Sequence, residues 1–92
     1  MIFNTVKDPN ATLDYTIDWT AWLGTDSISD SSWSIDIKGS LSLTDGGVEQ
    51  GVKAVVWLSG GKVGTTYNVV NRITTTAGRV DERTIVVLVQ DQ

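Results

Sequence analysis

The chain has 92 residues, of which seven are lysine or arginine, eleven are aspartate or glutamate, and none is cysteine or histidine. This length suits one domain with one core. Without cysteine and histidine, disulfides, Cys/His zinc sites and histidine-dependent catalytic triads are excluded. The formal net charge of −4 argues against nucleic acid as a partner, because proteins that bind phosphate backbones collect lysine and arginine on one face.

The opening of the chain predicts neither export nor membrane insertion. Residues Met1–Lys7 lack the basic segment and apolar core of a secretory signal. No apolar run approaches the roughly 18 residues that span a membrane as a helix. We therefore predict a soluble protein without a membrane partner. Residues 1–6 form either a short edge strand or a tail that docks on another molecule, and the turn residues Lys7–Asn10 follow.

The first clear strand is Leu13–Trp19, where apolar and polar residues alternate without a miss. Such alternation predicts a strand with one face in the core and the other in water. Thr20–Leu23 breaks the alternation, which indicates a corner or a single helical turn. The next strand lies within Asp26–Ile37. It requires a bulge between Ile28 and Trp33, because the apolar residues of its two halves would otherwise point to opposite faces.

Glycine marks two further turns. We predict a turn at Thr44–Gly47, after a short strand at Leu41–Leu43, because glycine accepts positive φ. Ser59–Gly64 is predicted to be a hairpin or crossover turn and not a phosphate-binding loop, since a strand and not a helix follows it. The last hairpin extends from Thr66 to Val89 and turns at Thr76–Arg79.

Two strands, Val52–Leu58 and Thr84–Val89, are apolar on both faces, so each lies inside a sheet or is covered by a partner. About seven short strands, regular turns and no helical periodicity predict an all-β fold. Residues 7–92 are expected to form a single immunoglobulin-like antiparallel β-sandwich. Tyr67 begins the penultimate strand after a glycine-containing turn, where such sandwiches have a tyrosine corner; the alternative is an ordinary inward-facing aromatic.

Four tryptophans are many for a domain of this size. Trp19 and Trp33 fall on the apolar parity of their strands, so we expect them in the core. Trp22 and Trp57 do not, and we expect them on an exposed surface that binds a partner, since tryptophan is enriched in interface hot spots. A tryptophan that stacks on a sugar ring has the same appearance in a sequence.

Acidic residues offer two candidate sites, and both lack the pattern that their chemistry requires. Asp14 and Asp18 share the wet face of the first strand but lie roughly 13 Å apart at ~3.3 Å per residue, too far for an acid/base pair. Asp26, Asp30 and nearby serines offer oxygen ligands for Ca²⁺, but the twelve-residue calcium loop and its closing glutamate are missing. We therefore expect no catalytic residue, no metal site and no cofactor.

The last hairpin carries a cluster of charged residues, namely Arg72, Arg79, Asp81, Glu82 and Arg83. The cluster is interpreted as a polar rim that selects a partner, as an ion-pair network across the hairpin, or as a solvated hairpin end. The predicted partner-binding residues are Trp22, Trp57, Arg79, Asp81, Glu82 and Arg83.

Several stretches together resemble a known family. They are Lys7–Pro9, Leu13–Trp19, Ser32–Ile35, Val56–Gly61, Gly64–Tyr67, Asn71–Thr75 and Gly78–Arg83. This set spans nearly the whole chain and is similar to small proteins of phages and prophages that are described as fiber-tail adaptors or virion proteins with an immunoglobulin-like fold.

The resemblance implies a structural and non-enzymatic role in the virion, with synthesis in the cytoplasm of the bacterial host. Several copies would form a ring in the tail or neck and connect it to fiber components. The implied partners are other phage structural proteins and copies of the chain itself, with no small-molecule substrate. From the residues alone, the alternatives are a carbohydrate-binding or adhesion module that uses Trp22 or Trp57, and an enzyme, which the lack of catalytic residues disfavours.

Overall fold

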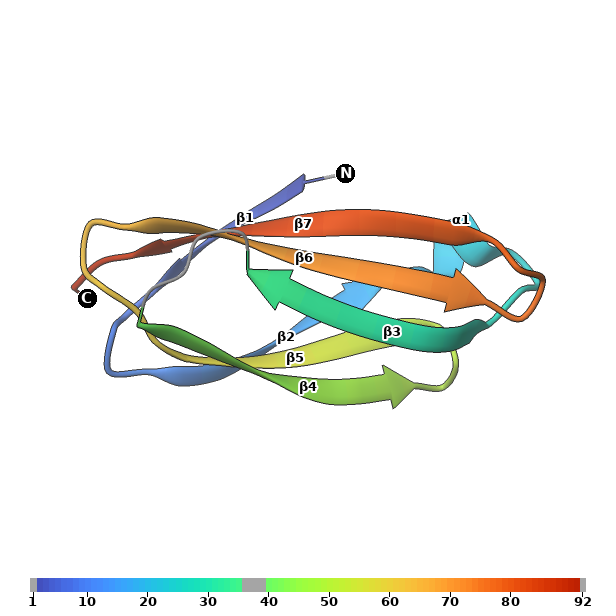
Figure 1. Cartoon of the computed structure of the whole chain (residues 1–92), viewed down its shortest axis with the longest axis horizontal. Coiled ribbons are helices and arrows are strands. Elements are labelled where there is room, and N and C mark those ends of the chain that lie inside the picture. Colours follow the sequence, from blue (N-terminus) through green and yellow to red (C-terminus); the bar gives the residue numbers. More distant parts are fainter. Residues whose placement is uncertain (1, 36–39, 92) are drawn as a thin grey trace.

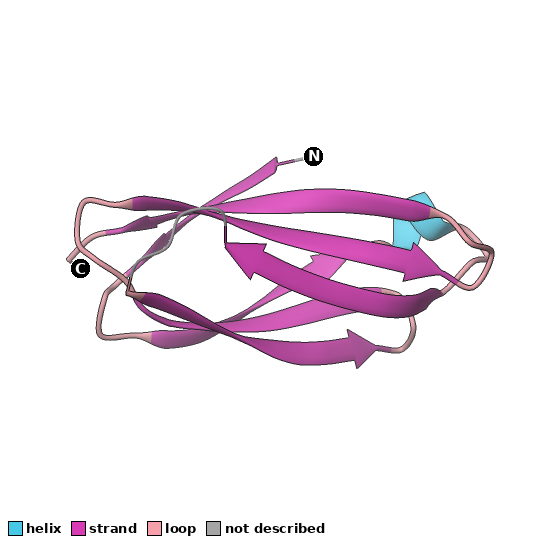
Figure 2. Cartoon of the chain, in the orientation of Figure 1, coloured by secondary structure: helices cyan, strands magenta, loops and turns pink. Residues whose placement is uncertain are grey.

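The computed structural model describes residues 2–35 and 40–91, which form two β-sheets packed face to face (Figure 1). The molecule measures 41 × 20 × 18 Å, and strands make up nearly all of its regular structure (Figure 2). The elements are β1 (Ile2–Lys7), β2 (Thr12–Asp18), α1 (Thr20–Leu23), β3 (Ile28–Ile35), β4 (Leu41–Glu49), β5 (Lys53–Gly60), β6 (Thr66–Thr75) and β7 (Val80–Val89). The predicted all-β sandwich of about seven strands is confirmed.

The two sheets differ in size and strand order. Sheet A has four strands in the order β1-β7-β6-β3, and sheet B has three in the order β2-β5-β4. Neighbouring strands are antiparallel except β1 and β7, which are parallel. The turn after β1 takes the chain into the other sheet, so β1 pairs with the last strand and not with β2.

The predicted strand at Leu13–Trp19 forms β2 and the residue after it. Ile17 and Trp19 are buried in the core, as the alternation predicts. Leu13 lies on the same parity but is 41 % exposed, because β2 is an edge strand whose first residues lack a neighbour on one side. The predicted helical turn at Thr20–Leu23 is confirmed as α1.

The turn predicted at Thr44–Gly47 is wrong, because β4 continues through these residues to Glu49 with a shift of register. Gly46 serves close packing there, since a Cβ atom at this position would lie 2.8 Å from Cγ1 of Val55. The chain reverses instead at Gln50–Gly51, where both residues have positive φ. Glycine has two uses, positive φ and close approach, and the sequence pattern does not separate them.

The other local predictions agree with the structure. The bulge in β3 lies between Ile28 and Asp30, and residues 36 and 37, where this strand was predicted to end, lie outside the described residues. Ser59 and Gly60 still belong to β5, and residues 61–65 then cross from sheet B to sheet A. Thr76–Arg79 connects β6 to β7. The strands β5 and β7, apolar on both faces, each lie between two neighbours in their sheets, so the prediction of internal strands is confirmed.

The core fills the space between the sheets and includes Tyr67. The side chain of Tyr67 is buried, and its hydroxyl accepts a hydrogen bond of 3.0 Å from the backbone N–H of Lys62, five residues upstream. This is the geometry of a tyrosine corner, so that prediction is confirmed. The hydrogen bond from Lys62 lowers the pKa of Tyr67.

Lys7, at the end of β1, is completely buried. Its Nζ atom donates hydrogen bonds to the backbone oxygens of Asp8 at 2.9 Å and Gly60 at 2.8 Å. Because Gly60 ends β5, this side chain ties β1 of sheet A to sheet B. Burial lowers the pKa of Lys7, since removal from water disfavours the charged amine. The sequence pattern does not distinguish this lysine from one on the surface.

Candidate functional site

One end of the sandwich holds a group of aromatic and charged side chains that we call the end cluster: Trp19, Trp22, Asp26, Arg79 and Arg83. Trp19 is completely buried, and its indole N–H donates a 3.0 Å hydrogen bond to Oδ1 of Asn71 in β6. Trp22, in α1, lies edge-on to Trp19 with ring centroids 5.4 Å apart and planes at 70°. Trp22 is half-buried, not the exposed aromatic that the sequence predicted.

Arginines of β7 and the turn before it cover both rings of the end cluster. The Arg79 guanidinium carbon lies 4.2 Å from the centroid of the Trp22 ring, and that of Arg83 lies 4.0 Å from the Trp19 ring. Arg79 also donates to the backbone oxygen of Leu23 at 2.9 Å, and Arg83 donates to that of Asp18 at 3.0 Å. The arginines therefore hold α1 and the end of β2 against sheet A through cation–π contacts and charged hydrogen bonds.

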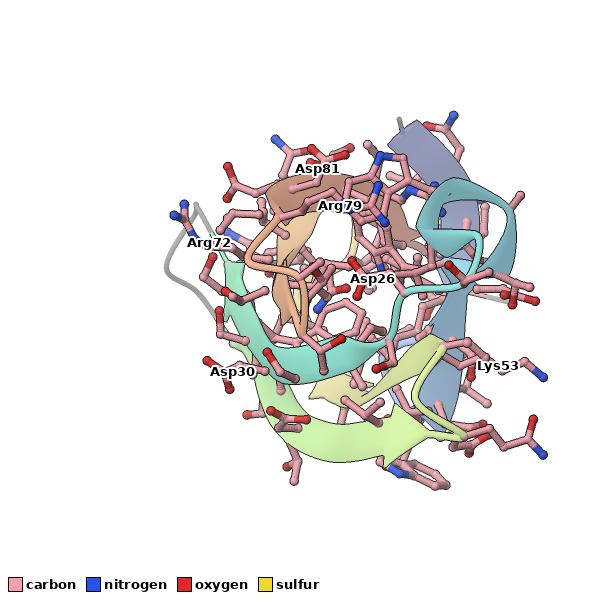
Figure 3. All side chains as sticks on the ribbon, turned by 90° about the vertical axis from the view of Figure 1, so that its right-hand side faces the viewer. Asp26, Asp30, Lys53, Arg72, Arg79 and Asp81 are labelled. Carbon is pink, nitrogen blue, oxygen red and sulfur yellow. The ribbon has the colours of Figure 1, made fainter. Side chains whose placement is uncertain are left out.

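Asp26 completes the end cluster (Figure 3). Its Oδ2 lies 3.1 Å from Nε of Arg79. Its Oδ1 accepts hydrogen bonds from the backbone N–H groups of Ser27 and Ala77 and from the Thr76 hydroxyl. This carboxylate is occupied by donors from the chain itself, which leaves it poorly suited to bind a cation.

The pKa of Asp26 is held far below its ordinary value of 3.8 by hydrogen bonds, first from the side chain of Thr75 and then from Thr76, Ser27 and Arg79. Asp30, the second candidate calcium ligand, points away from Asp26 in Figure 3. Within residues 2–35 and 40–91, no three acidic side chains lie close enough together to hold a metal ion.

The charged residues of the last hairpin do not act as one group. Arg79 pairs with Asp26, which lies outside the hairpin. Oδ1 of Asp81 accepts a hydrogen bond from the adjacent backbone N–H, and Glu82 is exposed opposite Arg72 in the β6–β7 register. The structure thus brings Trp22, Arg79 and Arg83 into the end cluster and leaves Glu82 on the outer face of sheet A.

Trp57 lies elsewhere, on the outer face of sheet B. Its neighbours in β5, Val56 and Leu58, are completely buried, so Trp57 points away from the core and is 45 % exposed. In the register of the sheet it is flanked by Asp14 of β2 and Thr44 of β4. The predicted exposure of Trp57 is confirmed, and Trp19 and the partly buried Trp33 pack in the core as predicted.

The outer face of sheet A is apolar along the second half of β7, where Val86 and Leu88 alternate with buried residues. Beside them Val6 of β1 is 39 % exposed. A hollow of about 350 Å³ lies on this face and is lined by Asn4, Thr5, Val6, Thr66, Val86 and Leu88. The two-sided apolar pattern of Thr84–Val89 indicated the β7 part of this surface. The contribution of β1 and β6 was missed, because it depends on which strands lie beside β7.

Comparison with known proteins gives one family. A search for relatives among curated proteins found no match. In the described part of the chain, none of the helices is long and apolar enough to span a membrane. The family model of the podophage GP4 fiber-tail adaptor protein gp77 matches residues 7–88. This match covers nearly all of the 92 residues and confirms the resemblance seen in the sequence motifs. The chain therefore belongs to the podophage GP4 fiber-tail adaptor protein gp77 family, a family of phage structural proteins.

Proposed function

We propose that the chain is a non-enzymatic adaptor of the podophage virion, present in several copies in a ring, that joins tail or neck components to fiber components through protein–protein contacts. Membership of the fiber-tail adaptor family supports this assignment. So do the exposed Trp57 on sheet B and the apolar hollow on sheet A, which offer surfaces for packing against a partner.

The observation that carries the proposal is the exposure of Trp57 at the middle strand of sheet B. A tryptophan side chain buries roughly 150–250 Å² when it is covered, and aromatic anchors of this kind supply much of the binding energy at protein interfaces. Within the described part of the chain, no ring or cation contact involves Trp57. Its ring is therefore available to a partner.

An adaptor needs two separate contacts, and the sandwich has a candidate surface on each of its outer faces. Trp57 projects from sheet B, and the apolar face around Val86 and Leu88 belongs to sheet A. Because the sheets pack face to face, these surfaces point in opposite directions. One copy can then contact a neighbouring subunit on each side.

The remaining residues proposed from the sequence lie at or near the end cluster. In this proposal Trp22, Arg79 and Arg83 fix the shape of that end, while Asp81 and Glu82 place charged groups near it on β7. Surface charges of this type set partner choice and association rate more than affinity.

Crosslinking of intact particles tests the proposal, with Lys62 and the outward-pointing Lys53 as attachment points on the chain (Figure 3). We expect crosslinks, identified by mass spectrometry, from these lysines to one tail or neck protein and to one fiber protein. Purified particles that lack the chain, or that crosslink it to neither component, would refute the adaptor role.

A carbohydrate-binding module is a second candidate, because Asp14 and Thr44 flank Trp57 in the same row of sheet B. An exposed ring beside hydrogen-bonding side chains also suits a sugar. A glycan array separates the two functions: a hit that Trp57→Ala abolishes would support this candidate, and a blank array would exclude it.

A further inference from the structure

The hollow on the outer face of sheet A has a definite chemistry. Its apolar lining residues are Val6, Val86 and Leu88, and its polar lining residues are Asn4, Thr5 and Thr66. None of the residues that line it is charged. It therefore suits a group with an uncharged apolar body and one or two hydrogen-bonding atoms, and it disfavours a charged group, which would lose hydration there without a counter-charge.

An indole ring matches this description. It has a large apolar surface and a single N–H donor, which the oxygens of Asn4 or Thr66 can accept. A cavity of about 150 Å³ holds benzene, so a hollow of about 350 Å³ has room for the two fused rings of indole. The chain itself exposes such a ring, Trp57, on the opposite face of the sandwich.

We propose that Trp57 of one copy inserts into the hollow lined by Val6, Val86 and Leu88 of the next copy, so that the occupant of the hollow is a second copy of this chain. This inference rests on the proposed function and names the contact between sister subunits. The ring on sheet B and the hollow on sheet A are then the two halves of one interface.

Such an interface is heterologous, because each copy contributes the Trp57 ring from its sheet B to one neighbour and the hollow on its sheet A to another. Heterologous contacts generate closed rings where the rotation between copies closes, and open filaments where it does not. The long and intermediate dimensions of the sandwich, 41 and 20 Å, limit the shared face to roughly 800 Å² per partner, which is the usual size of a specific interface. The contact is therefore large enough for association if most of the face takes part.

The competing arrangement is a twofold dimer in which Trp57 packs against Trp57 of its partner. That interface is isologous and leaves the hollow empty. A third arrangement fills the hollow with a side chain of another virion protein and leaves the chain monomeric on its own. The three arrangements predict different behaviour when variants are mixed.

Two variants separate them. Trp57→Ala removes the ring but keeps the hollow, and Thr66→Trp fills the hollow from an exposed position at the start of β6 but keeps the ring. We expect wild type to self-associate in analytical ultracentrifugation at high concentration. We expect the dissociation constant of each variant alone to rise roughly 30-fold or more, as for a hot-spot residue.

Mixing the two variants in equal amounts provides the decisive measurement. One Trp57→Ala chain offers a hollow to one Thr66→Trp chain, so association returns but stops at a one-to-one complex. The matched controls are Leu13→Ala and Val63→Trp, which change exposed residues outside the hollow and should self-associate like wild type. Circular dichroism establishes that each variant is folded.

The spectrum of the indole N–H groups gives a second readout. The resonance missing in Trp57→Ala identifies Trp57, and it should shift with concentration in wild type together with the backbone amides of Asn4 and Thr66. A wild type that stays monomeric, a mixture that fails to associate, or a Thr66→Trp chain that still self-associates would each overturn the inference. Crosslinks to tail and fiber proteins in that case would still uphold the adaptor role, so the two failures are distinguishable.

Discussion

Trp22 and Trp57 differ in what the rest of the chain provides for them. Trp22 packs edge-on to Trp19 and lies under the guanidinium of Arg79, whereas Trp57 projects from sheet B between Asp14 and Thr44. The first ring joins α1 to the core and contributes to stability. The second is exposed without an aromatic or cationic contact within the described residues, so it remains available for binding. Substitutions at the two places should therefore affect different measurements.

The strongest test of this difference is to remove the ring on which the end cluster is built. Trp19→Ala should lower the free energy of unfolding by about 3–5 kcal/mol, because it leaves a cavity and an unpaired Asn71 amide oxygen. This loss is about half of the stability expected for a small domain, which is on the order of 5–10 kcal/mol. Urea unfolding measures it, with Leu13→Ala as the exposed control. A loss below about 1 kcal/mol would show that the end cluster is not structural.

Acid should weaken the end cluster through Asp26. Its folded-state pKa lies far below the ordinary 3.8. At pH values near and below 3.8, Asp26 therefore binds more protons in the unfolded chain than in the folded one. Stability from Asp26 is therefore complete above pH 3.8 and decreases as the pH falls below it. Asp26→Asn should be less stable than wild type at pH 7 and should lose less stability between pH 4 and pH 2.

Thermal unfolding followed across this pH range provides the measurement. Asp30→Asn is the matched control: it retains Asp26 and should keep the loss of stability that Asp26 causes in wild type. If the melting temperatures of Asp26→Asn and wild type fall equally between pH 4 and pH 2, Asp26 is not the group that causes the loss of stability in acid.

Arg79→Ala should have a smaller effect of about 1–2 kcal/mol on the free energy of unfolding. It removes the cation–π contact with Trp22 and a charged hydrogen bond to the Leu23 backbone oxygen. Arg79→Lys should recover only part of the loss, because an ammonium group cannot reproduce the planar fork of a guanidinium. Arg72→Ala, an exposed change in the same hairpin, should shift unfolding by less than about 0.5 kcal/mol.

The smallest effect on stability is expected at Trp57. Trp57→Ala should leave the free energy of unfolding in urea within about 0.5 kcal/mol of wild type, since the ring is exposed, yet it should weaken binding to the partner strongly. Particles assembled with this variant should carry fewer fibers than particles assembled with Leu13→Ala, counted by electron microscopy. If Trp57→Ala unfolds easily, or if fiber numbers do not change, the separation between the two tryptophans fails.

The tyrosine corner and the internal position of β5 and β7 could be predicted from the sequence because they depend on local patterns. Tyr67 follows a glycine-containing turn, and Val52–Leu58 is apolar on both faces. The bulge in β4 could not be predicted, because Gly46 is required by the approach of Val55 from a neighbouring strand. The separation of Trp22 from Trp57 was also unpredictable, since it depends on Arg79 returning to α1 from a distant part of the chain.

Local patterns in the sequence are sufficient to predict a small β-sandwich, because alternation, turn residues and composition act within a few residues of each other. The sequence also carried the motifs by which the fiber-tail adaptor family is recognised. The exposure of Trp57 but not Trp22, and the hollow that β1, β6 and β7 form together, depend on tertiary packing. These features arise where strands far apart in the chain become neighbours, and sheet order is set by the packing of the whole core.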